Sequence, residues 1–196
     1  MMRRDLCLIR AVRLGRTPRS PGGPREYVGD NSPMGQLDRF RAAQDAPGSG
    51  FEAALQEVRT GAKTGHWIWY VFPQLQGLGA SAMSHAYALA DAAAAADYLR
   101  DPVLRARLLT ITAAVAEQIT TRGRPLRALM GSDVDARKLV SSLTLFEAVA
   151  ATLHREDGLT DYAAIARDAG EVLTAAAADG YARCAHTLGQ LASARS

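Results

Sequence analysis

A lysine and a histidine lie in the same short segment, GAKTGHW, immediately before two tryptophans. Lys63 and His66 are three residues apart, so this segment carries a cation and a titratable imidazole. A nearby ammonium lowers the pKa of an imidazole and keeps it neutral, able to act as an acid or base near pH 7. If the chain is catalytic, we expect His66 to be the acid or base and Lys63 to hold phosphate charge. The structural alternative is a surface lysine and a half-buried histidine bonded to the backbone.

The aromatic segment HWIWYVFP comes next and has more than one interpretation. Trp67 and Trp69 each offer a large apolar face, on which a base or a sugar can stack, and one N–H donor. The same rings can instead anchor the core, because aromatic side chains dominate burial energies. Exposed at the surface, the segment would form a patch for a protein partner, since aromatic side chains are enriched in interface hot spots.

A glycine-containing segment, QLQGLGAS, follows and runs into a predicted helix. Its candidate ligand-binding residues are Gln74, Gly79 and Ser81, because backbone amides and the dipole at a helix N-terminus favour anions. A simple turn before a helix gives the same pattern, so the motif alone does not establish a site.

Lys138, Ser141 and Ser142 share one face of a predicted helix, at spacings i, i+3 and i+4. Buried hydroxyls need hydrogen-bond partners, so two serines beside a lysine in an apolar helix are candidates for ligand binding. A Ser/Lys nucleophile is a second interpretation, and close helix packing through small side chains is a third. In the catalytic interpretation, Lys138 holds phosphate charge together with Lys63.

Helical periodicity continues from Leu37 almost to the end of the sequence and predicts an all-α fold, a single compact multihelical domain. Alternating strand patterns are absent, and only the run from Trp67 to Phe72 cannot be assigned by periodicity. Caps and breakers fix several boundaries, such as the dipeptide Asp101–Pro102 at a helix start. We expect helices near residues 37–44, 51–60, 83–90, 92–100, 102–118, 125–130, 133–150, 160–178 with a break at Gly170, and 181–192.

The positive charge of the chain is concentrated at its beginning. Residues 1–33 hold seven arginines against three acidic residues, which gives +4, whereas the other 163 residues together carry −1. We therefore expect residues 1–33 to be a disordered basic tail, an Arg-rich transit peptide or sequence upstream of the true start at Met34. Residues 34–196 would form the helical domain, with no broad basic face for nucleic acid.

Several classes of function are disfavoured by what the sequence lacks. The four histidines show no zinc-ligand spacing, two cysteines suggest no disulfide scaffold, and no apolar run is long enough to span a membrane. We expect a cytoplasmic protein without metal or cofactor. The oligomeric state stays open.

Four segments carry a resemblance to a known family; in order they are GAKTGHW, FPQLQGLG, ADYLRDPVL and KLVSSLTLF. The chain resembles the bacterial domain of unknown function 1810 family, whose members sometimes carry a calpastatin label, from about Leu37 to Val149 and more loosely to Leu191. The resemblance implies an all-helical domain without the first 33 residues, and it implies no activity. Near the end, CAHTL places Cys184 where the family pattern has an aspartate.

Two functions follow from these motifs. In the first, the GAKTGHW, QLQGLGAS and KLVSS segments converge on a pocket for a small anionic ligand, nucleotide-like or ADP-ribose-like. In the second, the chain is a non-catalytic interaction module that presents the HWIWYVFP segment to a protein partner.

Overall fold

The computed structural model describes residues 33–193, so the expectation of a separate tail concerns residues outside this range, except for Pro33. Within the range the chain is helical and contains no strand, which confirms the all-α multihelical domain. None of the helices in residues 33–193 is long and apolar enough to cross a membrane. The elements are α1 Pro33–Gln44, α2 Phe51–Thr60, α3 Ile68–Val71, α4 Ala82–Ala86, α5 Ala92–Arg100, α6 Pro102–Ala116, the π-helical turn η1 Glu117–Thr121, α7 Leu126–Met130, α8 Asp133–Asp157, α9 Thr160–Ala178 and α10 Ala185–Ser193.

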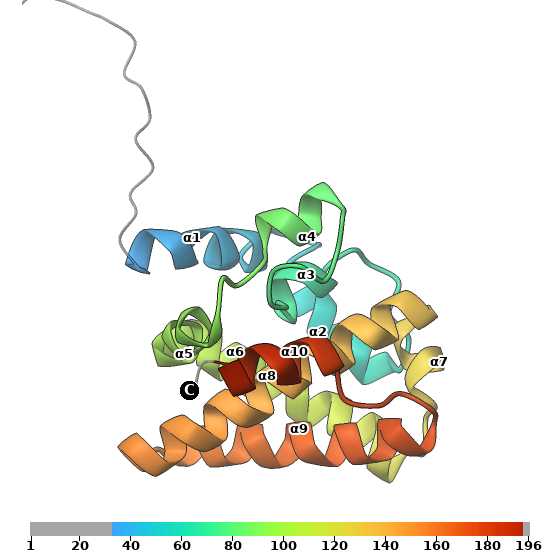
Figure 1. Cartoon of the computed structure of the whole chain (residues 1–196). Helices are drawn as coiled ribbons and strands as arrows, with labels where there is room; N and C mark the ends of the chain where they lie inside the picture. The colour runs from blue at the N-terminus through green and yellow to red at the C-terminus, as the bar shows by residue number, and fades with distance from the viewer. Residues whose placement is uncertain (1–32, 194–196) are drawn as a thin grey trace, which may run out of the picture.

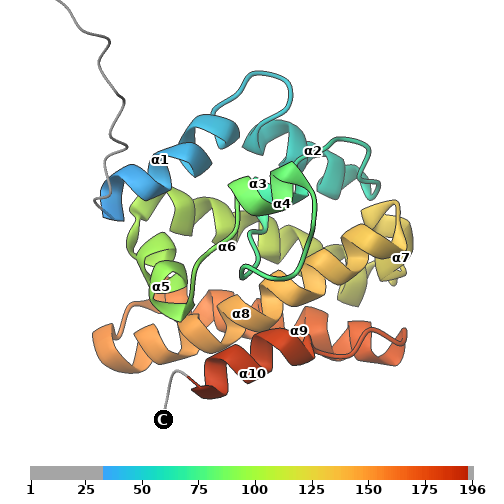
Figure 2. The ribbon, with the colours of Figure 1, turned by 45° about the horizontal axis from the view of Figure 1, so that its top comes forward.

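Helix α8 lies at the centre of the arrangement. It packs most extensively against α9 and also packs against α3, α5, α7 and α10. Figure 1 shows α9 on one side of α8 and the N-terminal helices α1 to α4 on the other, and Figure 2 shows α10 running beside α8. Because neighbours surround it, α8 buries both apolar and hydroxyl side chains along its middle.

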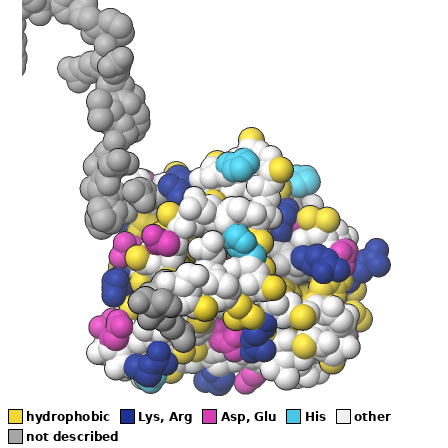
Figure 3. Space-filling model, viewed as in Figure 1, with side chains coloured by type: hydrophobic (Ala, Val, Ile, Leu, Met, Phe, Trp, Pro, Cys, Tyr) yellow, Lys and Arg dark blue, Asp and Glu magenta, His cyan; other side chains and the backbone are white. Residues whose placement is uncertain are grey.

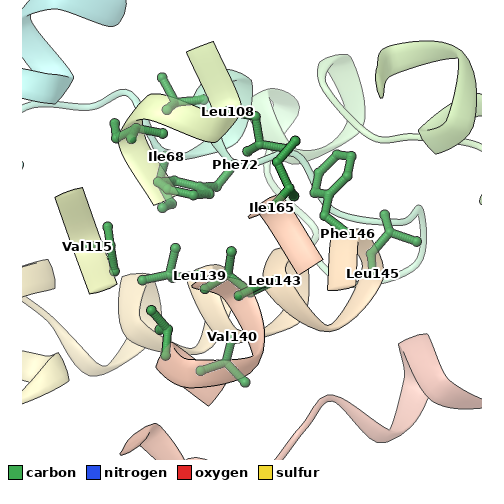
Figure 4. Packing of buried hydrophobic residues seen from close by; sticks show 14 of the residues in the cluster. Ile68, Phe72, Leu108, Val115, Leu139, Val140, Leu143, Leu145, Phe146 and Ile165 are labelled. Atoms are coloured by element: carbon green, nitrogen blue, oxygen red, sulfur yellow. The ribbon is translucent and has the colours of Figure 1, made fainter. Parts of the chain in front are cut away.

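The aromatic segment contributes to this core rather than to the surface. Ile68 and Phe72 are fully buried, and Figure 4 shows them among Leu108 of α6 and the α8 side chains Leu143 and Phe146. Periodicity left the run from Trp67 to Phe72 unassigned, and its middle, Ile68–Val71, forms a single helical turn.

Capping residues and glycines in the sequence predicted several helix ends correctly. Gly61 ends α2 with a φ of 86°, a left-handed conformation that favours glycine. Asp101 caps α6 with Pro102 in its first turn, and Ser132 caps α8 by accepting a hydrogen bond from the backbone N–H of Asp135.

Three boundaries differ from the prediction for physical reasons. Helix α8 runs seven residues past Ala150, to the left-handed Gly158. Helix α9 continues through Gly170, where the missing side chain gives room to Glu147 of α8, whose Oε1 would lie 3.0 Å from a Cβ. The helix expected from Tyr181 begins only at Ala185. Tyr181 is buried and its hydroxyl donates a hydrogen bond to Asp133, which keeps residues 181–184 out of the helix.

The helix expected over residues 83–90 is also shorter than its pattern suggested. Only Ala82–Ala86 is helical, because an isolated parallel bridge pairs Leu75 with Leu89. The N–H of Leu89 donates to Gln74 and that of Gln76 donates to Leu89, both at 2.9 Å. The segment from Gln74 to Leu89 therefore forms a closed loop with α4 at its tip.

Asp101 joins two elements as well as capping one. Its Oδ1 accepts from the N–H groups of Val103 and Leu104, and its Oδ2 accepts from the guanidinium of Arg41 in α1, with Nε at 3.0 Å. Burial by itself would raise the pKa of Asp101, but the hydrogen bonds from Arg41 and the two amides outweigh it and hold the pKa below its ordinary value.

We predict that Asp101→Ala destabilises the fold more than Asp91→Ala, which removes only the N-cap of α5. The expected loss is about 1 kcal/mol for Asp91→Ala and about 2 to 3 kcal/mol for Asp101→Ala, measured by urea unfolding at pH 7. Because ionised Asp101 stabilises the folded state, the difference between wild type and Asp101→Ala should shrink as the pH falls below about 4. Equal losses for the two variants would show that the ion pair with Arg41 contributes nothing.

Candidate functional site

Two ammonium groups share one carboxylate at the start of α8. Lys63 Nζ lies 2.7 Å from Asp135 Oδ2, and Lys138 Nζ lies 3.0 Å from Asp135 Oδ1. These two residues are the only lysines in the sequence, whose other basic side chains are all arginine. The structure thus brings both lysines, 75 positions apart, to the same acidic group.

The GAKTGHW loop is fixed against the junction of α7 and α8. The N–H of Lys63 donates to Leu129 of α7 at 2.8 Å, and its Nζ donates to the carbonyl of Gly65 at 2.6 Å. Gly131, with a φ of 73°, packs so closely that a Cβ there would lie 2.8 Å from the Lys63 carbonyl oxygen. This loop therefore needs glycine at position 131 to deliver Lys63 to Asp135.

A second carboxylate holds the loop from the side of α2. Glu57 Oε2 accepts from the N–H groups of Thr64 and Gly65, at 2.8 and 2.9 Å, and from Trp67 Nε1 at 2.7 Å. Burial would raise the pKa of Glu57, but these three donors lower it below its ordinary value. Glu57 was not singled out from the sequence, since nothing in its spacing marks it.

Each lysine also lies over an indole ring. Lys63 Nζ is 5.1 Å from the centre of the Trp67 ring, and Lys138 Nζ is 4.4 Å from that of Trp69. Trp67 is buried, whereas Trp69 is half-buried with its Nε1 enclosed and without a hydrogen-bond partner among the described residues. The rings therefore serve as cation–π surfaces that hold the ammonium groups in place.

The interaction-module hypothesis required these aromatic side chains to be exposed. Trp67, Tyr70 and Phe72 are 1%, 7% and 0% exposed, and only Trp69 keeps part of its surface. The geometry corrects that hypothesis, because burial in the core leaves no aromatic patch for a partner to contact.

A pocket of about 390 Å³ opens beside Lys138, between the N-terminal half of α8, the segment before α10 and the loop that follows α3. Aliphatic side chains and a few polar groups form its walls, which is the usual composition of a small-molecule site. Its lining residues are Gln74, Leu78, Val134, Arg137, Lys138, Val140, Ser141, Tyr181, Ala182 and Cys184.

Some polar groups of the pocket already have hydrogen-bond or ion-pair partners within the protein, and others do not. Arg137 is paired with Asp133 at 2.9 Å, and Asp133 also accepts the hydroxyl of Tyr181. Ser141 Oγ lies 3.3 Å from Thr187 Oγ1 of α10. No hydrogen bond within the described residues engages the side-chain amide of Gln74, so it remains available to a ligand.

Cys184 adds a thiol to the pocket, immediately before α10. It is a free cysteine and half-buried. Burial would raise its pKa, but hydrogen bonds from the hydroxyls of Thr187 and Ser141 and from the first backbone amides of α10 lower the pKa below its ordinary value. Because Cys184 lines the pocket, the reactivity of its thiol can be used to detect a ligand bound there.

The remaining residues predicted for the site lie elsewhere. His66 is exposed and does not line the pocket, and Ser142 is buried without a partner in the described residues. Gly79 and Ser81 are exposed in the loop around α4, where Ser81 caps that five-residue helix by accepting from Ser84. Lys138 bonds Asp135 rather than a serine, so no Ser/Lys pair is formed.

Sequence reasoning missed the residue that joins the two lysines. Asp135 stands three positions before Lys138 on the same helical face, a spacing that favours an ion pair and was available as a signal. Arg137 and Tyr181 were also missed, because only the folded chain brings Tyr181 beside α8. In residues 33–193 no group of three or more histidine, cysteine or acidic side chains is arranged to hold a metal ion.

Charge on the surrounding surface is mixed. Basic and acidic side chains are interspersed on the face shown in Figure 3. No broad basic patch is seen on that face.

Comparisons with known proteins identify a family and a structural relative. The family described as "Protein of unknown function (DUF1810)" matches residues 34–171. The chain is similar to a solved structure, the conserved hypothetical protein Rv1873 from Mycobacterium tuberculosis, with 34% identity and a TM-score of 0.55 over 72% of this chain and 94% of that one. No curated protein matches. The family match includes Lys63, Asp135 and Lys138 and ends before Tyr181 and Cys184.

We predict that Asp135→Ala lowers the free energy of unfolding by about 3 to 5 kcal/mol, because it leaves the 6%-exposed side chain of Lys63 charged, buried and without a carboxylate. Denaturant unfolding of the single and double variants measures the effect. Adding Lys63→Met should recover part of the loss, since the double variant no longer buries the charge of Lys63 without a carboxylate. Additive losses for Asp135→Ala and Lys63→Met would contradict the pairing.

Proposed function

The chain belongs to the DUF1810 family of proteins of unknown function, and we propose that it binds a small anionic ligand in the pocket beside Lys138. The observation that carries this proposal is the pair of ammonium groups held on a single carboxylate, Asp135. Gln74 and Ser141 are the ligand-binding residues that we retain from the sequence prediction. Lys138, predicted to hold phosphate charge in a catalytic site, becomes a ligand-binding residue, and Arg137 and Tyr181 join them.

The charges at the site do not balance. Lys63 and Lys138 carry two positive charges and Asp135 one negative charge, so one positive charge is left over. The side chains of Lys63 and Lys138 are only 6% and 21% exposed, and water screens such charges poorly. An anion bound against Lys138 would neutralise the excess and add a charge-assisted hydrogen bond.

The walls of the pocket supply the remaining binding energy. Leu78, Val134 and Val140 offer apolar surface. The half-buried side-chain amide of Gln74 and the hydroxyl of Ser141 can fix the orientation of a polar group by hydrogen bonding. A volume of about 390 Å³ falls toward the small end of ligand sites. We therefore propose a ligand with an acidic group at the Lys138 end and a compact, partly apolar body.

Nucleotide-like and ADP-ribose-like compounds combine these properties and form the class to test first. We assign no catalytic role to His66, which lies outside the pocket lining. Lys63 acts through Asp135 in this proposal, and Lys138 meets the ligand directly. The cytoplasmic location expected from the sequence stays a prediction.

We predict that thermal unfolding in the presence of nucleotides, ADP-ribose, nicotinamide cofactors or sugar phosphates will identify a stabilising compound. Saturation at one hundred times the dissociation constant adds about 2.7 kcal/mol of stability. Lys138→Met should abolish the shift, whereas the control Arg122→Met, which removes an exposed cation paired with Glu117, should keep it. A shift that is the same in Lys138→Met as in wild type would place the binding site elsewhere.

Alkylation of Cys184 tests where the ligand binds. Because Cys184 lines the pocket, a compound that stabilises the fold should slow its reaction with iodoacetamide, measured by peptide mass spectrometry. Free glutathione in the same reaction serves as the reference and should react at an unchanged rate. Stabilisation without protection of Cys184 would contradict binding in this pocket.

A further inference from the structure

We infer that Asp135 determines which ligand charge the pocket prefers. The pocket would bind a singly charged anionic group, a carboxylate or a phosphodiester, more tightly than a doubly charged phosphate monoester. This inference rests on the proposed function and adds the chemical class of the group that meets Lys138. Its basis is the count and placement of charges at the pocket.

The pocket-lining side chains that carry a permanent charge are Arg137 and Lys138. Arg137 lines the pocket but is paired with Asp133, so this pair contributes no net charge. Lys63, Lys138 and Asp135 then leave one positive charge. A monoanion brings the total to zero, whereas a dianion leaves one negative charge beside the Asp135 carboxylate.

The position of Asp135 makes this difference matter. Its side chain is 16% exposed and remains bonded to both ammonium groups, so it cannot move into water away from a second negative charge. Repulsion between like charges a few ångströms apart is strong where water is largely excluded. Repulsion from Asp135 therefore weakens binding of a dianion more than binding of a monoanion, which Lys138 can still neutralise.

Asp135 also decides which face of Lys138 is available. The carboxylate holds Lys138 Nζ at 3.0 Å, and the Trp69 ring lies 4.4 Å from the same atom. An ammonium group has three N–H donors, and these two neighbours leave one direction open for the ligand. A single oxygen of a carboxylate or phosphodiester satisfies that direction.

Matched pairs of compounds test the charge preference on the full-length protein. Cyclic AMP and AMP share their base and sugar but carry one and two negative charges, and benzoate and phenyl phosphate form an aryl pair. We expect isothermal titration to show about tenfold tighter binding of the singly charged member in at least one pair. Preference within the cyclic AMP pair identifies a phosphodiester group, and preference within the benzoate pair a carboxylate.

The Asp135→Asn variant tests the residue itself. It raises the excess charge from one to two, so the preference for the singly charged member should disappear or reverse. Asp38→Asn makes the same chemical change at an exposed position paired with Arg41, and it should leave the preference unchanged. An unchanged preference in Asp135→Asn would overturn the role of Asp135.

The pH dependence in wild-type protein gives an independent result that does not require a variant to fold. The second pKa of a phosphate monoester is about 6, so AMP becomes singly charged on acidification. AMP should therefore bind more tightly at pH 5 than at pH 8, while binding of cyclic AMP changes little.

The outcomes separate the two proposals. If compounds bind but the singly charged member binds more tightly in neither pair, the small-anion pocket stands and the charge selection is wrong. If no compound of either pair binds or protects Cys184, the charge selection is overturned together with the proposed ligand class.

Discussion

The burial of α8 on nearly every side is the constraint from which the rest of the structure follows. In a helix enclosed by α3, α5, α7, α9 and α10, most buried polar groups need partners within the protein. Thr144 does so by donating to the carbonyl of Val140, and Ser141 does so through Thr187. Near its N-terminus α8 also has room for charged side chains, and there Lys138 lines the pocket with Asp135 bonded to it.

Asp135 and Glu57 together tie the site to the frame of the fold. Glu57 fixes the loop from α2, and Asp135 fixes the same loop from α8 through Lys63. The loop is thus held at both ends by carboxylates that accept several hydrogen bonds each. A ligand that meets Lys138 therefore contacts a preorganised network rather than a flexible side chain.

Local chemistry predicted the helices well, because caps and glycines act within a few residues. Asp101 before Pro102 and the left-handed Gly61 are signals of this kind. The site was predictable only in part: Lys63 and Lys138 were expected to act on one ligand, but their shared contact with Asp135 depends on the docking of a loop onto α8. The pocket wall at Tyr181 was not predictable, since its helical pattern was overridden by burial of the ring and its bond to Asp133.

The scarcity of lysine has a consequence for the covalent chemistry of the protein. Besides its amino terminus, the chain has two primary amines, and that of Lys63 is nearly inaccessible. Acylation of a side-chain amine in the folded protein therefore falls on Lys138. Because acetylation removes the positive charge of a lysine, one such modification would remove the positive charge that Lys138 presents at the pocket. Among the side chains of this protein, a general amine-directed modification therefore acts as a site-directed one.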